Sequence, residues 1–385
     1  MKLGIITDCV HFYTSNGEVS TENHIFLRQM EALASYFTET LICCPFSPFD
    51  LDMVYSTYHK KNMKFIPLPN VGGNTIGDKL KLFKAIPMWL STFKKINAAS
   101  DVVYQRFPNN LNLPGFFYFY FKKKPVFATY TGTWQSYPQE PKTYRLQRWL
   151  LQKYFRGPVW VYKNETNSAR IKPGFSPSYN IKEWKEEWGQ VAARIERLKN
   201  EGLSFLRLIT VGSLVDYKNQ IAIIKACAIL KSRQVLFKLT IVGDGPTRQL
   251  LLKAIKENDL TQQVVLAGKK DHVALRELYR QHDFVVQAPL SEGFGKVPVE
   301  GFFHGVIPVI NNIAMAKNMT GNKERGFLFN AAETLELADT LTTLKDDPDT
   351  LIAMIKNGRE FARSQTLESW AEDYYLTVTD YFERA

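Results

Sequence analysis

Short apolar runs alternate with helical patterns along the whole chain, and this alternation restricts the possible folds more than any other feature. Runs that end at glycine, proline or a polar turn predict buried parallel strands, and the segments between them predict crossover helices. The first half contains the runs KLGIITDCV, TETLICCPF, KFIPLP, DVVYQRF, PVFATYT and PVWVYKN. The pattern restarts in the second half with LRLITVG, FKLTIVG, VVLAG, DFVVQAP and VIPVI. We therefore expect an α/β protein with two doubly wound, Rossmann-like domains and a cleft between them.

The two series of runs set the expected domain limits. We predict an N-terminal domain over 1–175, a C-terminal domain over 176–365 and a closing helix over 366–385 that packs back on the N-terminal domain. One early helix is expected over 22–37, where apolar residues recur at helical spacing. With 385 residues, 45% of them hydrophobic, the chain can bury a full core in each domain.

The spacing of the cysteines and the length of the apolar tracts indicate the cellular compartment. The four cysteines show no C-x-x-C spacing, which is typical of reduced thiols in the cytosol. The N-terminal run MKLGIITDCV is interrupted by Asp8 and has no small-residue cleavage site, so it predicts a first strand rather than a signal peptide. The longest apolar tract, at 113–121, falls short of the ~20 residues that cross a bilayer. We expect a cytoplasmic protein. Its six histidines and scattered acids form no metal-ligand pattern, so we expect no metal ion.

The net charge of +11 is confined to the first half. Residues 1–175 contain 22 Lys and Arg against 11 Asp and Glu, and residues 176–385 contain 27 of each. In this half, stretches such as FYFYFKKKP and YRLQRWLLQKYFR mix cations with aromatic residues. Two explanations remain open: the N-terminal domain docks on the anionic inner face of a membrane, or its lysines cover solvated faces of core helices. A nucleic-acid-binding protein is disfavoured, because no RRM, KH or zinc pattern occurs.

The stretch SEGFGKVPVE at 291–300 follows a predicted buried strand and carries the strongest chemical signal. Pro298 suits the first turn of a helix, so a helix is predicted to begin near 295–297. The positive end of its dipole would then present free backbone N–H groups to a phosphate, from Gly295, Lys296 and Val297.

Two acids bracket this glycine turn. Glu292 would stay in the loop and Glu300 would lie about one turn into the helix, so that each could hydrogen-bond a polyol. A phosphate flanked by two hydroxyl-binding carboxylates describes a sugar nucleotide. An alternative remains open, with Glu292 as a solvent-exposed loop acid and Glu300 as an acid favoured by the helix dipole.

These motifs together resemble a known family. EGFGKVPVE followed by GVIPVI resembles the E-x7-E signature of GT-B glycosyltransferases of family 4, the retaining nucleotide-sugar enzymes. VGSLVDYKNQIAIIKA is similar to that family's phosphate-binding strand and helix, IVGDGP to its next strand turn and VVLAGKK to its base-pocket strand. The resemblance covers about 205–330. It implies a GT-B fold in which an N-terminal acceptor-binding domain and a C-terminal nucleotide-sugar-binding domain face a central cleft.

The resemblance implies roles for individual residues. Glu300 would bind the nucleotide ribose, Glu292 would contact the donor sugar beside the reacting carbon, and Lys218 would neutralise the donor diphosphate. The remaining implied contacts are to the phosphates and to the base. They would come from Gly212 and Ser213 in the first glycine turn, from backbone N–H groups of Gly295, Lys296 and Val297, and from Gly268 and Lys269 beside the base.

The chain departs from the family pattern in three places. Ser213 stands five residues before the phosphate lysine, where the family usually has arginine, and we hypothesise that Lys296 substitutes for that missing cation. The first-domain glycine loop is reduced to SNGEV, which leaves Asn16 and Gly17 to close over the donor. Where many members carry a histidine after a first-domain strand, this chain has ATYTGTW.

The resemblance implies a metal-independent, retaining hexosyl- or related transferase without a cofactor. It would move a sugar from a UDP- or GDP-linked donor to a saccharide or lipid-linked saccharide, in surface polysaccharide or glycan assembly. Charge on the departing diphosphate would be met by Lys218, Lys296 and the helix N-terminus. Two alternatives remain open: another GT-B sugar-nucleotide enzyme, such as an epimerase or phosphorylase, and a nucleotide-sugar-binding homologue that is inactive because of Ser213.

Overall fold

The computed structural model divides the chain into two compact units, which are described separately. Unit 1 consists of Met1–Ser176 and Leu367–Ala385, and unit 2 of Pro177–Thr366. The limits expected from sequence lie one residue earlier at each junction. The structure describes residues 1–50, 54–73, 75–137, 140–163, 168–313, 315–343 and 347–383.

Unit 1 is built on a parallel sheet whose described strands follow the order β10-β9-β8-β7-β1-β4-β6. Strand order reverses between β1 and β7, which is where doubly wound sheets bind ligands at their carboxyl edge. The strands are β1 (Lys2–Ile6), β4 (Glu39–Phe46), β6 (Met63–Pro69), β7 (Val102–Phe107), β8 (Val126–Thr133), β9 (Val159–Tyr162) and β10 (Ile171–Pro173).

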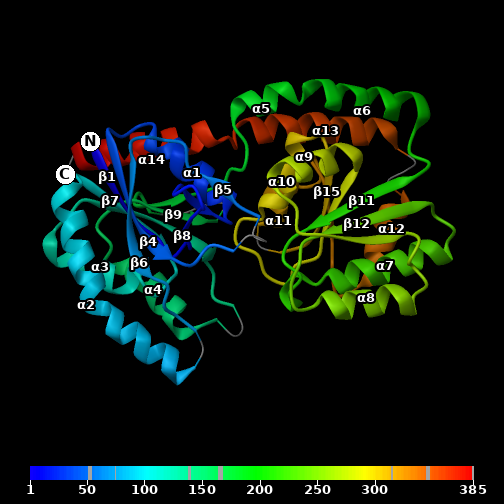
Figure 1. The fold of residues 1–385 in the computed structure, drawn as a ribbon. Helices are drawn as coiled ribbons and strands as arrows, with labels where there is room; N and C mark the ends of the chain where they lie inside the picture. The colour runs from blue at the N-terminus through cyan, green and yellow to red at the C-terminus, as the bar shows by residue number, and fades with distance from the viewer. Residues whose placement is uncertain are drawn as a thin grey trace. The chain divides into compact units, whose positions relative to one another are not determined.

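Helices cover both faces of this sheet (Figure 1). They are α1 (His24–Ala34), α2 (Ile76–Ala99), α3 (Asn112–Lys122), α4 (Lys142–Lys153) and α14 (Leu367–Glu383). The first of them is shorter than the helix expected over 22–37. It begins after Asn23, whose side chain accepts a hydrogen bond of 3.0 Å from the N–H of Phe26 and so caps the helix.

The last helix, α14, belongs to unit 1 although the whole of unit 2 lies between it and the rest of unit 1 in sequence. It packs on α1, and its Tyr374 ring stacks on the buried Trp160 at 3.8 Å between centroids. The indole N–H of Trp160 also donates to Asp373 at 2.7 Å. The aromatic residues of the final segment therefore complete the core on one face of the unit 1 sheet.

A small antiparallel sheet of β2 (Phe12–Tyr13), β3 (Val19–Thr21) and β5 (Ser56–Thr57) follows the first strand of unit 1. Asn16 and Gly17 lie in the exposed turn between β2 and β3. Gly17 has a φ of +77° and donates its N–H to the carbonyl of Thr14 at 2.9 Å. The two residues thus form a hairpin tip in unit 1, and their predicted contact with a donor stays a prediction.

Unit 2 has a second parallel sheet, with described strands in the order β13-β12-β11-β14-β15-β16. Strand order reverses between β11 and β14, so the segments after these two strands meet at one edge. The strands are β11 (Leu206–Val211), β12 (Phe237–Val242), β13 (Val264–Gly268), β14 (Phe284–Gln287), β15 (Ile307–Asn311) and β16 (Phe327–Phe329).

Two layers of helices enclose the unit 2 sheet (Figure 1). One layer contains α7 (Gln220–Ser232), α8 (Arg248–Glu257) and α12 (Thr334–Thr343). The other contains α5 (Ile181–Glu186), α6 (Trp188–Glu201), α9 (His272–Gln281), α10 (Lys296–Phe303) and α13 (Pro348–Arg363). The short segments η1 (Asp216–Lys218) and α11 (Ala316–Thr320) lie at the carboxyl edge of the sheet.

Each unit therefore has the Rossmann-like α/β architecture expected from the sequence. Every strand-like run named from the sequence forms a strand of one of the two parallel sheets. Within the described ranges, no helix is both long enough and apolar enough to cross a bilayer.

Candidate active site

The two glutamates of SEGFGKVPVE lie close to the start of α10: Glu292 is in the loop that follows β14, and Glu300 is in α10 itself. Helix α10 begins at Lys296, within the predicted start of 295–297, and Gly295 precedes it with a φ of +77°. This left-handed conformation favours glycine. The cap residue Gly295 makes no side-chain hydrogen bond to the helix, and the positive end of the helix dipole lies at this turn.

Hydrogen bonds from neighbouring strands hold this loop in position. The N–H of Leu290 donates to the carbonyl of Tyr217 at 2.8 Å, which ties the loop to η1. The Asn311 amide donates to the carbonyl of Pro289 at 2.7 Å, and the Gln287 amide donates to the carbonyl of Val211 at 3.2 Å. The sequence analysis missed Asn311 and Gln287, which carry no signal except their position at the ends of β15 and β14.

The ammonium of Lys218 forms an ion pair with the Glu292 carboxylate. Lys218 ends η1, and Asn219 follows it with a φ of +53°, which turns the chain into α7. Both side chains are partly exposed, at 16% for Lys218 and 25% for Glu292. The structure therefore brings together the two residues predicted to contact the diphosphate and the sugar.

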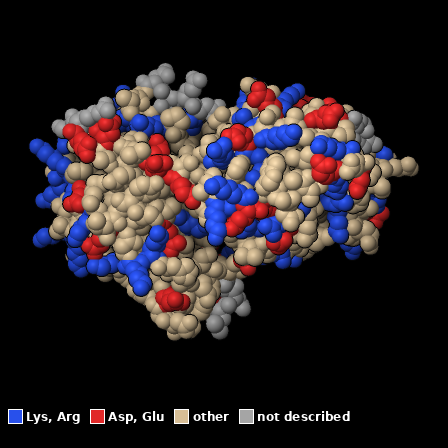
Figure 2. Space-filling view, turned by 90° about the horizontal axis from the view of Figure 1, so that it is seen from above, with Lys and Arg blue, Asp and Glu red and all other residues tan. Residues whose placement is uncertain are grey.

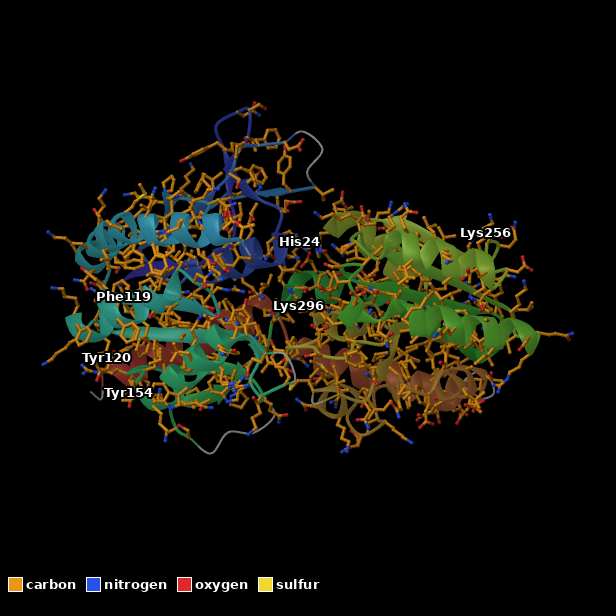
Figure 3. All side chains as sticks on the ribbon, turned by 90° about the horizontal axis from the view of Figure 1, so that it is seen from below. His24, Phe119, Tyr120, Tyr154, Lys256 and Lys296 are labelled. Carbon is orange, nitrogen blue, oxygen red and sulfur yellow. The ribbon has the colours of Figure 1, made fainter. Side chains whose placement is uncertain are left out.

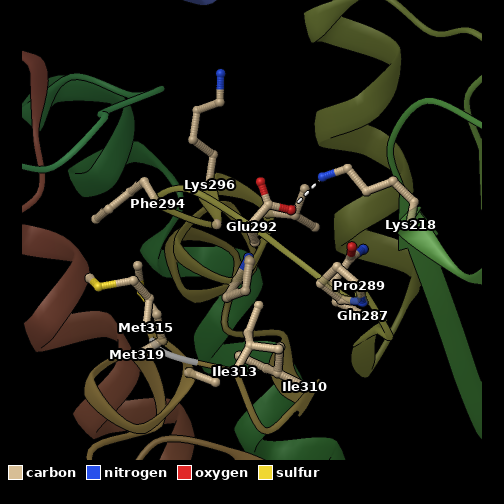
Figure 4. A pocket seen from close by; sticks show the side chains of 14 residues that line it. Lys218, Gln287, Pro289, Glu292, Phe294, Lys296, Ile310, Ile313, Met315 and Met319 are labelled. Carbon is tan, nitrogen blue, oxygen red and sulfur yellow. Dashed lines mark hydrogen bonds and ion pairs between the residues drawn. The ribbon is translucent and has the colours of Figure 1, made fainter. Parts of the chain in front are cut away.

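A pocket of about 530 Å³ opens beside this ion pair (Figure 4). Its polar wall contains Lys218, Glu292 and the backbone of Gly295 to Val297. The opposite wall is apolar and contains Phe294, Ile310, Ile313, Met315, Ala316 and Met319. The pocket thus offers a cation, a carboxylate and a helix N-terminus on one side of an apolar cavity.

Lys296 lines the same pocket, but its side chain extends away from the Lys218–Glu292 pair in Figure 4. Ser213 is exposed, and its carbonyl accepts a hydrogen bond of 3.1 Å from the Gln220 amide. The hydroxyl of Ser213 does not line the pocket. An exchange of the Lys296 rotamer would be needed before its ammonium could act beside Lys218.

The glycine turns after β11 and β12 pack directly against each other. A Cβ on Gly243 would lie 1.9 Å from the carbonyl oxygen of Gly212, and one on Gly245 would lie 2.5 Å from the carbonyl oxygen of Leu214. A Cβ on Gly212 would lie 3.9 Å from Cδ of Lys218. The glycines of IVGDGP are thus required by close packing, and they support the segment that carries Lys218.

Glu300 is buried, with 7% of its surface exposed, and each of its oxygens has a protein donor. The Ser178 hydroxyl donates to one oxygen at 2.6 Å, and the Tyr279 hydroxyl donates to the other at 3.0 Å. Burial raises the pKa of Tyr279 well above its usual value, with a further contribution from Glu300, so the phenol stays a donor. A carboxylate has about four lone-pair sites, but Glu300 does not line the pocket beside Lys218, and its predicted contact with a ribose stays a prediction.

Gly268 ends β13, and Lys269 follows it at the same carboxyl edge. Gly268 has a φ of +71°, and its carbonyl accepts the N–H of Gly243 at 2.9 Å. Lys269 is exposed. Neither lines the pocket beside Lys218, and both lie beyond β12 in the sheet order, so their predicted contact with the base stays a prediction.

The described residues contain no group of three or more His, Cys, Asp or Glu side chains gathered as a metal site requires.

Comparison with known proteins finds similarity over the segment that contains Lys218, Glu292 and Glu300. Residues 195–361 match the family model of glycosyl transferases group 1. Protein CapJ of Staphylococcus aureus is 31% identical over 143 residues, which are 36% of this chain and 36% of that protein. N-acetyl-alpha-D-glucosaminyl L-malate synthase of Bacillus anthracis is 28% identical over 145 residues, 37% of this chain and 38% of the relative.

A third relative, from Campylobacter jejuni, is N-acetylgalactosamine-N,N'-diacetylbacillosaminyl-diphospho-undecaprenol 4-alpha-N-acetylgalactosaminyltransferase. It is 29% identical over 151 residues, 39% of this chain and 40% of the relative. The chain thus matches less than half the length of these curated relatives. Among solved structures, Anabaena Alr3699/HepE in complex with UDP and glucose superposes with a TM-score of 0.73 at 16% identity, over 98% of this chain and 99% of that one. The chain therefore has the GT-B fold.

Proposed function

We propose, from the group 1 glycosyltransferase segment at residues 195–361, that the chain moves a sugar from a nucleotide-linked donor to an acceptor. The acceptor is a saccharide or lipid-linked saccharide, and the product enters polysaccharide or glycan assembly. The donor carries UDP or GDP. The Lys218–Glu292 ion pair at the mouth of an apolar pocket carries this proposal, because it joins a phosphate-binding cation to a hydroxyl-binding carboxylate.

Donor binding would separate Lys218 from Glu292, because each would bind a different part of the same ligand. The donor diphosphate takes Lys218 and the positive N-terminal end of α10, while the sugar hydroxyls donate to Glu292. Glu300 accepts hydrogen bonds from the ribose, held in place by Ser178 and Tyr279. These contacts orient the donor with its reacting carbon beside Glu292.

Charge that develops on the departing diphosphate is stabilised by Lys218 and by the helix N-terminus, without a metal ion. Lys296 adds a second cation when its side chain turns toward the pocket. The acceptor hydroxyl attacks on the face from which the diphosphate leaves, so the anomeric configuration is retained. The family resemblance supports this stereochemistry.

The name of one relative supports the acceptor class. The Campylobacter jejuni relative acts, by its name, on a diphospho-undecaprenol-linked saccharide, whereas the Bacillus anthracis relative is named for a malate product, and malate is not a saccharide. A cytoplasmic enzyme with a lipid-linked acceptor would work at the inner face of the membrane.

The surface of unit 1 favours such a location. Its helices expose apolar side chains beside lysines, and Figure 2 shows Lys and Arg gathered along the margin of unit 1 drawn at the left. Phe83 on α2 is 67% exposed and Phe121 on α3 is 76% exposed. Tyr154, after α4, is 47% exposed and lies at the edge of unit 1 in Figure 3. Apolar side chains among cations are typical of helices that lie in the headgroup layer of an anionic bilayer.

A panel of UDP- and GDP-linked sugars tests the proposal. The purified chain should release free nucleotide from one base series, faster with a lipid-linked saccharide than without it. Interconversion of the sugar without nucleotide release would favour an epimerase. Binding without any turnover would favour an inactive homologue, and the retaining transferase would then be wrong.

A further inference from the structure

A second polar pocket lies wholly within unit 1, apart from the site described above. It has a volume of about 640 Å³ and opens at the carboxyl edge of the unit 1 sheet, between the ends of β1 and β7. This is the point where strand order reverses, and doubly wound sheets bind ligands there. Its lining residues are Thr7, Asp8, Cys9, Asn23, Phe26, Arg106, Phe107, Pro108 and Thr131.

Arg106 is the only cation among these lining residues. Its guanidinium donates to Oε1 of Gln29 at 3.3 Å, and its Cζ lies 4.8 Å from the centroid of the Phe26 ring. The Gln29 amide in turn donates to the Ser176 hydroxyl at 2.9 Å, which turns its oxygen toward Arg106. Within the described residues, no carboxylate comes within 4.0 Å of this guanidinium.

Arg106 is half-buried, and its guanidinium contacts the neutral amide oxygen of Gln29 and the Phe26 ring. These contacts compensate its positive charge only in part. Buried charges in proteins are normally paired, and a guanidinium carries five N–H donors. Most of the donors of Arg106 are thus available to a ligand that enters the pocket. The planar fork of arginine suits phosphate and carboxylate groups, which accept two of its hydrogen bonds at once.

The other polar groups of the pocket already have protein partners. The Asn23 side chain caps α1, and the Thr131 hydroxyl donates to the carbonyl of Phe107 at 3.0 Å. The Thr7 hydroxyl accepts the N–H of Cys9 at 3.1 Å. The N-terminus of α1, which begins at His24 (Figure 3), also faces the pocket through Asn23 and Phe26, so its dipole adds to the positive potential of Arg106.

Asp8 is the counterpart of Arg106 at the rim. It is exposed at the end of β1 and lies in the same pocket. Desolvation raises its pKa above the usual value, and the Arg106 charge opposes that rise. A carboxylate in the same pocket as a cation can accept a hydrogen bond from a ligand hydroxyl while the cation holds an anionic group.

We propose that this pocket binds an anionic substituent of the acceptor, a phosphate or a carboxylate, on Arg106, with a neighbouring hydroxyl of the same molecule on Asp8. The assignment of the ligand as the acceptor rests on the proposed transferase function. The anion site itself does not, because it is formed by unit 1 alone.

Small probes without a nucleotide test the site directly. We would measure the melting temperature and the calorimetric affinity of the full chain with glycerol 3-phosphate, with lactate and with uncharged glycerol, all at one ionic strength set with sodium chloride. The phosphate and carboxylate arms distinguish the two anion sources. We expect saturable binding of at least one anion and none of glycerol.

Variants locate the binding. Arg106→Gln removes the charge, and we expect it to weaken the bound probe about tenfold or more. Arg106→Lys keeps the charge without the planar fork, so an intermediate affinity is expected. Arg156→Gln is the matched control, because Arg156 also lies over an aromatic ring of unit 1, 4.2 Å from the Tyr120 centroid, but outside this pocket.

Measurements on the same variants distinguish a failure of the anion site from a failure of the proposed transferase function. Titration with UDP and GDP reports on unit 2, so loss of probe binding with intact nucleotide binding concerns the unit 1 pocket alone. Circular dichroism confirms the fold of each variant, and Arg106→Lys provides the comparison if Arg106→Gln does not fold. Equal probe affinity in the wild type and the Arg106 variants, or no anion binding by the wild type, would overturn the anion site.

Discussion

The Lys218 ammonium donates to the Glu292 carboxylate across 74 residues of sequence. Without a ligand, the cation that should hold a diphosphate is therefore neutralised by the acid that should hold a sugar. A nucleoside diphosphate must compete with Glu292 for Lys218, and it also approaches the Glu292 charge. A complete sugar nucleotide avoids this conflict because its hydroxyls donate to Glu292.

This competition predicts opposite effects of one substitution on binding and on turnover. Glu292→Gln removes the competing charge, so the affinity for the free nucleoside diphosphate should rise about threefold to tenfold. Turnover of the sugar nucleotide should fall about a hundredfold or more, because an oriented hydrogen bond at the reacting sugar is weakened. Calorimetry and initial rates measure the two effects. If the variant binds the diphosphate more weakly than the wild type, Glu292 does not compete for Lys218.

The next prediction concerns Ser213, which stands where the resembled family usually has arginine, and Lys296, which we hypothesise replaces that cation. Lys296→Ala should lower turnover about tenfold, because one cation is lost from the leaving group. Ser213→Arg placed in the Lys296→Ala background should restore part of the rate, since position 213 lies in the turn before Lys218. Lys317→Ala, an exposed lysine on α11 outside the pocket, should leave the rate unchanged. Unchanged turnover in Lys296→Ala, with loss of turnover in Lys218→Ala, would refute the substitution of Lys296 for arginine.

Glu187 should make unit 2 sensitive to acid. It is buried, and Arg280 donates to it through two nitrogens at 2.8 Å each. Burial alone would raise the pKa of Glu187, but the hydrogen bonds from Arg280 and His304 outweigh it and hold the pKa well below its usual range. A depressed folded pKa contributes stability above the unfolded value of about 4.3, and this stability is lost as the pH falls below it.

The substitution Glu187→Gln should therefore reduce the free energy of unfolding by about 1.5–3 kcal/mol at neutral pH, since it removes a charged hydrogen-bond acceptor of the partly buried Arg280. The difference from the wild type should shrink as the pH falls below about 4. Denaturant titration at several pH values measures both effects. Glu277→Gln is the matched control, because Glu277 also pairs with Arg280 but is 54% exposed, and little change is expected. A destabilisation independent of pH would contradict the role of the Glu187 charge.

Membrane docking predicts flotation with anionic vesicles. The wild type should float with vesicles that contain phosphatidylserine and not with phosphatidylcholine alone, since each cation near the surface adds about 1 kcal/mol. The double variant Phe83→Ser and Phe121→Ser should lose most of this binding. Val273→Ser with Leu335→Ser removes equally exposed apolar residues from unit 2 and should not. Absence of lipid-dependent flotation at moderate salt would show that the lysines only cover solvated helices.

The sequence was informative where a feature depends on neighbours in the chain. The strands, the start of α10 near Lys296 and the turn before Lys218 follow from local periodicity, glycine and proline. The sequence could not show that Lys218 pairs with Glu292, because that contact depends on β11 and β14 being neighbours in the sheet.

Long-range burial explains what the sequence analysis missed. Ser178 lies 122 residues from Glu300, and no local pattern links the two. Arg106 lies within a strand-like run, where an arginine carries no sign of a pocket. Its importance depends on the lack of a carboxylate within 4.0 Å of it among the described residues, although Asp8 lies in the same pocket. The orientation of the Lys296 side chain likewise depends on tertiary contacts and not on its place in SEGFGKVPVE.

The most direct test of the central claim is nucleotide binding at Lys218. UDP and GDP would each be titrated calorimetrically into the wild type, into Lys218→Met and into Lys225→Met, an exposed lysine on α7 that serves as control. We predict that one of the two nucleotides binds the wild type and Lys225→Met equally, and that Lys218→Met loses about tenfold or more in affinity. If neither nucleotide binds the wild type, or if Lys218→Met binds as tightly as the control, the proposed donor site is wrong.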